Sequence, residues 1–189
     1  MPDAAPPEPL DLDDVKLFLR VDTSDDDMMI EGLIIAARTH IEDFTGLILT
    51  PRTVTETASQ LGRWIDLASW PVTSVSAIRY SSGGKMVPFA AGAWVESLKR
   101  RPVRLLPTSA AWGLGWLGCA PAQLPVEIDV VAGYATPADV PQPVKQAMLL
   151  LVGHFYSNRN AAEVGARAAA IEPPFSVSAL LRSYRAVRV

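Results

Sequence analysis

The segment 140–159, VPQPVKQAMLLLVGHFYSNR, constrains the fold more than any other part of the chain. Prolines near its start are tolerated in the first turn of a helix. The residues from Ala147 to Val152 include no polar side chain, and Phe155 and Tyr156 follow shortly after. A helix on the surface of a small domain needs one apolar stripe and one polar face. This helix is apolar on two sides, so a second packing partner must cover it.

Helix caps and three- to four-residue apolar spacing predict the other helices. Asp11 is a suitable N-cap for a first short helix, and Thr23 or Ser24 for a second, which Gly46 ends. A last short helix, SALLRSYR, precedes the C-terminal residues. The expected helices lie near 12–20, 24–45, 142–159 and 177–185.

Between Thr50 and Tyr134, apolar residues fall in short segments bounded by glycine, proline and serine, which is typical of strands. The run Ser81-Ser82-Gly83-Gly84 predicts the tip of a hairpin. We therefore predict an α+β fold, an α-helical bundle with an inserted antiparallel β domain. Residues 1–49 and 135–189 would form the helical domain with a C-terminal arm, and residues 50–134 the β domain.

The charges are unevenly distributed along the chain. There are 12 acidic and 3 basic residues from Met1 to Asp43, but 2 acidic and 5 basic residues from Arg159 to Val189. The net charge of −3 is not that of a generic nucleic-acid binder. An acidic beginning and a basic end indicate two different electrostatic surfaces.

Residues 1–10 are rich in proline and alanine, which predicts a flexible lead. They have neither a basic nor an apolar run, so they do not form a signal peptide. No run of about 18 apolar residues lacks glycine or proline, so no membrane span is expected. The single cysteine, Cys119, excludes an internal disulfide and a cysteine-based zinc site.

Two groups of side chains could bind a metal, and each has a simpler interpretation. Consecutive carboxylates in Asp25-Asp26-Asp27 point about 100° apart on a helix, so they cannot converge on one ion. Acids at a helix start instead match the helix dipole. His40 and His154 lie in helices that are expected to pack together, but two histidines without a third ligand make a poor metal site.

Two other motifs could carry catalysis or phosphate binding. Glu127 and Asp129 share one face of a strand, which suits either acid–base work or a solvated polar face. The turn before Lys85 lacks the spacing of a phosphate-binding loop. We therefore expect no catalytic residue, no metal and no cofactor, and a protein that is not an enzyme.

Two further segments suggest contacts with other molecules. The basic group 99–101 with Arg104 could meet phosphates or acids of a neighbouring chain, or lie on a solvated hairpin. The glycine-rich loop with Trp112, Leu114 and Trp116 suits either a protein contact or packing over the β core.

Several segments, which together extend over nearly the whole chain, match the pattern of one known protein family. A short helix LDDVKLFLRVD leads into DDDMMIEGLIIAARTHIEDFTG and LTPRTVTET. After the β segments come VEIDVVAGYATPADVPQPVKQAMLLLVGHFYSNRNA and a final SVSALLRSYR. This order resembles the head–tail connector, or adaptor, proteins of tailed phages and of gene transfer agents, in the longer subfamily with a β domain after the second helix.

The resemblance implies a structural part of a particle neck that assembles in the bacterial host cytoplasm. Such adaptors form a ring, usually of twelve copies, that joins the portal to the stopper, also called the head-completion protein, or to a tail protein. DNA passes through the channel of the ring without sequence-specific binding.

The implied contact residues fall in three groups. The arm that grips the portal would extend from Glu172 to Val189, with contacts from Phe175, Leu180, Leu181, Arg182, Tyr184, Arg185 and Arg188. The two long helices would supply the subunit interface, with Leu33, Ala37, Ile41, Met148, Leu151 and Phe155. The loop with Trp112, Leu114 and Trp116 could meet another neck protein.

A different class of function stays open at this stage. The tryptophans of the β domain could form the platform of a small-ligand or carbohydrate binding module. That interpretation predicts a pocket with tryptophan walls in a stable monomer.

Overall fold

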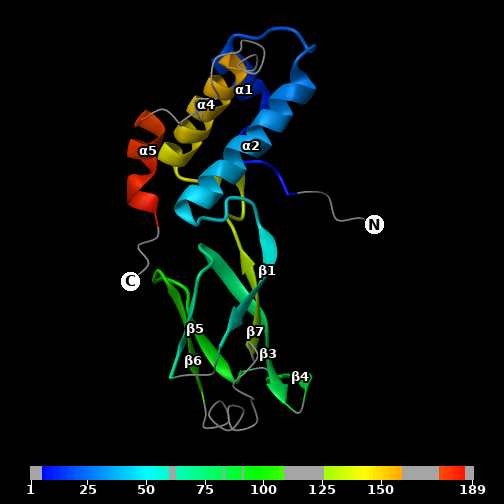
Figure 1. The fold of residues 1–189 in the computed structure, drawn as a ribbon, viewed down its shortest axis with the longest axis vertical. Helices are drawn as coiled ribbons and strands as arrows, with labels where there is room; N and C mark the ends of the chain where they lie inside the picture. The colour runs from blue at the N-terminus through cyan, green and yellow to red at the C-terminus, as the bar shows by residue number, and fades with distance from the viewer. Residues whose placement is uncertain are drawn as a thin grey trace, which may run out of the picture. The chain divides into compact units, whose positions relative to one another are not determined.

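The computed structural model describes residues 6–59, 63–82, 84–90, 92–108, 126–158 and 175–185. The chain divides into two compact units (Figure 1). We call Met1–Thr50 with Tyr134–Val189 the helical unit and Pro51–Gly133 the β unit. Helices and two antiparallel sheets make the fold α+β, which confirms the predicted class.

The helical unit contains the helices that the spacing of apolar residues and the capping residues predict. Asp11 caps α1, because its Oδ1 accepts a hydrogen bond from the Asp13 backbone nitrogen at 2.9 Å. Gly46 ends α2 with a positive φ of 71°, which glycine adopts without strain. The elements are α1 (Leu12–Leu19), α2 (Asp27–Thr45), η1 (Pro137–Asp139), α4 (Gln142–Ser157), α5 (Phe175–Leu181) and η2 (Arg182–Tyr184).

The start of α2 differs from the prediction. The helix begins at Asp27, and neither Thr23 nor Ser24 caps it with a side chain. Asp26 occupies the N-cap position, but its carboxylate accepts a hydrogen bond from the Tyr156 hydroxyl of α4 instead of a backbone nitrogen. A tertiary hydrogen bond therefore replaces the local cap that the sequence favours.

The N-terminal lead is also packed more tightly than its composition predicts. Leu10 is buried, and so is Pro9. Glu8 forms an ion pair with Arg38 of α2 at 2.8 Å. The described part of the lead, residues 6–10, therefore corrects the expectation of a flexible segment, because these apolar and ionic contacts fix it on α2.

The β unit consists of two antiparallel sheets. The first has the strand order β1-β7-β3-β4 and the second β2-β6-β5. The strands are β1 (Arg52–Ala58), β2 (Ile65–Leu67), β3 (Val72–Ser82), β4 (Lys85–Pro88), β5 (Trp94–Ser97), β6 (Val103–Pro107) and β7 (Val126–Ala132). β3 and β4 pair Ser82 with Lys85, which confirms the predicted hairpin between them.

Strand β7 lies inside the first sheet, paired with both β1 and β3. Its side chains alternate between a buried and a more exposed face, as pleating requires. Val126, Ile128 and Val130 face the core, whereas Glu127 and Asp129 face outward. The two sheets are joined where the Glu96 carboxylate of β5 accepts a hydrogen bond from the Val75 backbone nitrogen of β3.

Candidate functional site

Helix α4 is the centre of the helical unit. It packs against α2, α5 and α1, and Figure 1 shows it between α2 and α5. Five of its side chains are fully buried: Val144, Ala147, Met148, Leu151 and Val152. The second apolar side of this helix is therefore covered within the chain, by α1 and α5. The sequence pattern indicated two covers, with the next subunit expected as the second; α1 and α5 of the same chain pack there instead.

This packing corrects part of the predicted subunit interface. Ala37 and Ile41 of α2 and Met148 and Leu151 of α4 are 0% exposed. A side chain without exposed surface offers nothing to a neighbouring subunit, so these four residues belong to the core. The other two members of the predicted set, Leu33 and Phe155, are half-buried and retain some surface.

Helix α5 anchors the beginning of the predicted C-terminal arm. Val177 and Leu181 are each 1% exposed, and α5 packs on α4. The Arg185 guanidinium lies over the Phe44 ring of α2, 5.4 Å from its centroid, within cation–π range. Leu181 was expected to contact another protein, but it is buried in its own subunit because this short helix needs an apolar anchor.

Other arm residues are accessible. Phe175 is 88% exposed, and Arg182 is exposed as well. Leu180 and Tyr184 are half-buried. Arg188 lies outside the described residues.

Helices α1 and α2 also carry exposed apolar side chains. These are Leu17, Phe18, Met28 and Ile35. Phe18 packs closely on α4, because a Cβ placed on Gly153 would lie 3.1 Å from its Cε1 atom. Single exposed apolar residues are common, so only those beside a pocket or a complementary surface indicate a contact.

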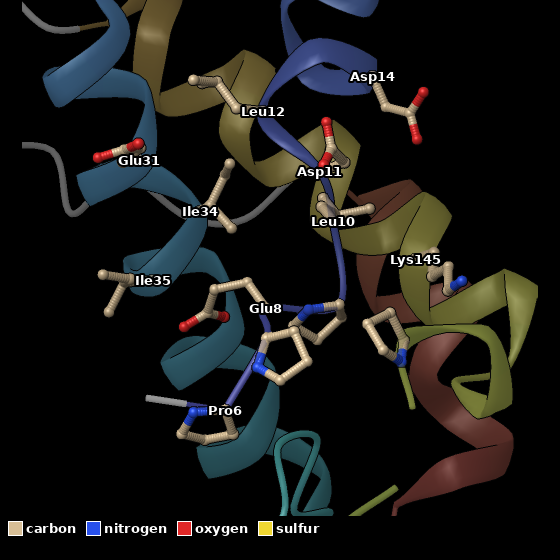
Figure 2. A pocket seen from close by; sticks show the side chains of 13 residues that line it. Pro6, Glu8, Leu10, Asp11, Leu12, Asp14, Glu31, Ile34, Ile35 and Lys145 are labelled. Atoms are coloured by element: carbon tan, nitrogen blue, oxygen red, sulfur yellow. The ribbon is translucent and has the colours of Figure 1, made fainter. Parts of the chain in front are cut away.

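A pocket of about 580 Å³ lies between the N-terminal lead, α2 and the start of α4. Figure 2 shows the lead with Pro6, Glu8 and Leu10, while Ile35 lies on α2 and Lys145 on α4. The lining is largely apolar, with acidic side chains among it. The lining residues are Pro6, Pro7, Glu8, Pro9, Leu10, Asp11, Leu12, Asp14, Glu31, Ile34, Ile35, Pro137 and Lys145.

The acidic residues at the start of α2 serve the fold. Asp27 forms an ion pair with Lys16 of α1 at 2.6 Å, and Asp26 binds Tyr156. Within the described residues, no three His, Cys, Asp or Glu side chains are grouped so that they could hold a metal ion. His154 and its helix neighbour Asn158 face each other, with 3.3 Å between the ring Nδ1 and the amide Nδ2.

The two carboxylates of β7 belong to an ion-pair network on the outer face of the first sheet. Arg79 of β3 contacts Glu127 at 3.2 Å and donates two hydrogen bonds to Asp129. Those bonds, together with one from the Thr55 hydroxyl, hold the pKa of Asp129 below its usual value. The pKa of Arg79 is raised in turn, mainly by its hydrogen bonds to Asp129 and to a smaller extent by that to Glu127. The network ties β1, β3 and β7 together, and both carboxylates are already engaged.

The second sheet carries another ion pair, next to an exposed aromatic ring. Arg104 of β6 binds both carboxylate oxygens of Asp66 in β2, at 2.6 and 2.7 Å. The hydrogen bonds from Arg104 lower the pKa of Asp66, and the charge of Arg100 adds to the effect. The Arg104 guanidinium also stacks on the Trp64 ring at 4.3 Å from its centroid. The predicted contact residues Trp112, Leu114 and Trp116 lie outside the described residues.

Among the residues that the structure describes, no helix is long and apolar enough to span a membrane.

Comparisons with known proteins identify proteins similar to this chain. Residues 9–85 match a family model described as phage gp6-like head-tail connector protein. No curated protein sequence matches the chain.

Solved structures similar to the chain come from gene transfer agent particles. A chain from the neck of an empty GTA particle, computed with C6 symmetry, is 28% identical, with a TM-score of 0.70 over 98% of this chain and 94% of that chain. A chain from the virion of a native gene transfer agent particle is 28% identical, also with a TM-score of 0.70, over 99% and 95%. A chain from the neck of a native GTA particle, computed with C12 symmetry, is 27% identical, with a TM-score of 0.63 over 92% and 89%. The resemblance to head–tail connectors, including those of gene transfer agents, is thereby confirmed.

Proposed function

We propose that this chain is a head–tail adaptor in the neck of a gene transfer agent or a related phage-like particle. The observation that carries the proposal is the similarity to a GTA neck chain along 98% of this chain and 94% of that one. A likeness of that extent includes both the helical and the β unit. The role is structural and non-enzymatic, and assembly takes place in the bacterial host cytoplasm.

The adaptor acts as a homo-oligomeric ring, and we propose that the ring contains twelve copies. Similar chains come from necks computed with C6 and C12 symmetry, which supports a cyclic arrangement. Closed rings use a heterologous contact, in which one surface of a subunit meets a different surface of the next. DNA passes through the channel of the ring without sequence-specific contacts, and the ring joins the portal to a stopper or tail protein.

The C-terminal end of the chain is the portal-binding part. Val177 and Leu181 fix α5 on α4, so the base of the arm has a defined position on the helical unit. The residues beyond Arg185, which include Arg188, continue from that base. A basic end with a fixed base suits docking onto the surface of another protein.

The test is binding of the full chain to its portal ring, imaged by negative-stain electron microscopy. A truncation before Glu172 would also remove α5 and uncover α4, so the informative variant instead ends at Arg185. The full chain should add a stoichiometric collar, and the truncated chain should not. A collar from both would refute the arm assignment alone. The absence of a collar from the full chain would refute the adaptor role.

A further inference from the structure

Helix α5 presents an exposed face on the outside of the helical unit. Phe175 and Ala179 of α5 and Arg182, the first residue of the following η2, are exposed and are spaced four and three residues apart, so they follow one side of these helical turns. The opposite side, with Val177 and Leu181, is the one buried on α4. The outer face therefore has a large aromatic residue at one end, a small residue in the middle and a cation at the other end.

The pocket between the N-terminal lead and α2 has the complementary character. Leu10 and Ile34 are buried beside it, and Ile35, 47% exposed, gives it an accessible apolar wall (Figure 2). Asp14 and Glu31 also line it and are exposed. Of the four acidic residues in the lining, Glu8 is paired with Arg38 and Asp11 caps α1. Asp14 and Glu31 still outnumber the one basic residue of the lining, so a cation that enters with an apolar group is favoured there.

In the part of the chain that the structure describes, the outer face of α5 is exposed and the pocket is open. Phe175 is 88% exposed although the pocket is present in the same helical unit. The pocket lies between the lead, α2 and the start of α4, whereas α5 packs on α4 (Figure 1). A pocket and a matching exposed face at two places on one unit suit a head-to-tail contact, which closes into a ring when the rotation between copies allows it.

We propose that the pocket of one subunit receives the outer face of α5 and η2 from the adjacent subunit, with Phe175 against Ile35 and Arg182 near Glu31, in place of the portal contacts that the resemblance implied for Phe175 and Arg182. The occupant is thus a second copy of this chain. This inference rests on the proposed ring and specifies which surfaces form it. An amphipathic helix laid into a groove is a common mode of protein recognition.

Disulfide cross-linking tests this contact directly. The full chain, in a Cys119→Ser background, carries Ile35→Cys, Phe175→Cys or both, and is oxidised alone and on its portal ring. The double variant should give a ladder of linked species, because each subunit then has both ends of the contact. A mixture of the two single variants should stop at dimers. Leu17→Cys with Phe175→Cys is the matched control, since Leu17 is exposed outside the pocket, and it should give no ladder.

Charge exchange gives an independent measurement. Glu31→Lys or Arg182→Glu alone should reduce the cross-linked yield by up to about fivefold, as for a partly exposed ion pair, and the two together should restore it.

The outcomes separate the two proposals. Collars on the portal without a link between positions 35 and 175 would overturn the proposed contact and leave the adaptor role intact. If neither collars nor cross-links form, both proposals are overturned. A ladder from the control pair equal to that of the test pair would also refute the pocket as the docking site.

Discussion

Replacing Leu151 with alanine distinguishes a core role from an interface role for this residue. The side chain is 0% exposed in α4, so its loss removes buried apolar surface and leaves a cavity. Substitutions of this kind at fully buried sites cost roughly 2.7–5.0 kcal/mol, and we expect the free energy of unfolding of the helical unit to fall by about 3 kcal/mol. An interface residue would instead leave the stability of the isolated chain unchanged.

The preceding residue provides the matched control. Leu150 is half-buried in the same helix, so Leu150→Ala removes the same atoms from a site with some access to water. Its expected cost is about 1 kcal/mol, because less apolar surface is exposed to water on unfolding.

Urea denaturation of the isolated chain, followed by the helical circular dichroism signal, measures both variants. With a slope of about 2 kcal/mol per molar urea, Leu151→Ala should lower the midpoint by about 1.5 M and Leu150→Ala by about 0.5 M. If Leu151→Ala kept the wild-type midpoint but lost ring assembly on the portal, α4 would be an interface helix and the reasoning above would be refuted.

Two carboxylates, Asp129 in the β unit and Glu42 in the helical unit, support two further predictions. Because Arg79 lowers the pKa of Asp129, that carboxylate stabilises the folded β unit above its unfolded pKa of about 3.9, and the contribution is lost as pH falls through the lower folded pKa. Asp129→Asn should therefore reduce stability at neutral pH and flatten its decline below about pH 4, measured by tryptophan fluorescence in urea. Glu42, 9% exposed, accepts a 2.7 Å hydrogen bond from the Leu49 backbone nitrogen, so Glu42→Ala should cost about 2 kcal/mol, and a loss no greater than that of exposed Asp43→Ala would contradict this role.

Local sequence signals determined the elements of this protein and their order. A capping aspartate at Asp11 and a glycine at Gly46 fixed one boundary each of α1 and α2. The alternation in β7 correctly placed Glu127 and Asp129 on one face. These signals act between neighbouring residues in the chain, where backbone geometry alone sets which side chains share a face. The resemblance to connector proteins rested on the same segments.

Only the tertiary structure decided which surfaces meet. The apolar pattern of α4 required two covers, but the same pattern fits a neighbouring subunit or α1 and α5 of the same chain. The sequence could not decide between them, because hydrophobic contact is non-directional and leaves no mark of its partner in the sequence. The burial of Leu181 and Met148 within one chain answers the question. The proline-rich lead likewise became a wall of the pocket through contacts with distant residues, among them the ion pair between Glu8 and Arg38. Sequence periodicity determines which side chains must be buried, whereas the packing of distant segments determines which residues they are buried against.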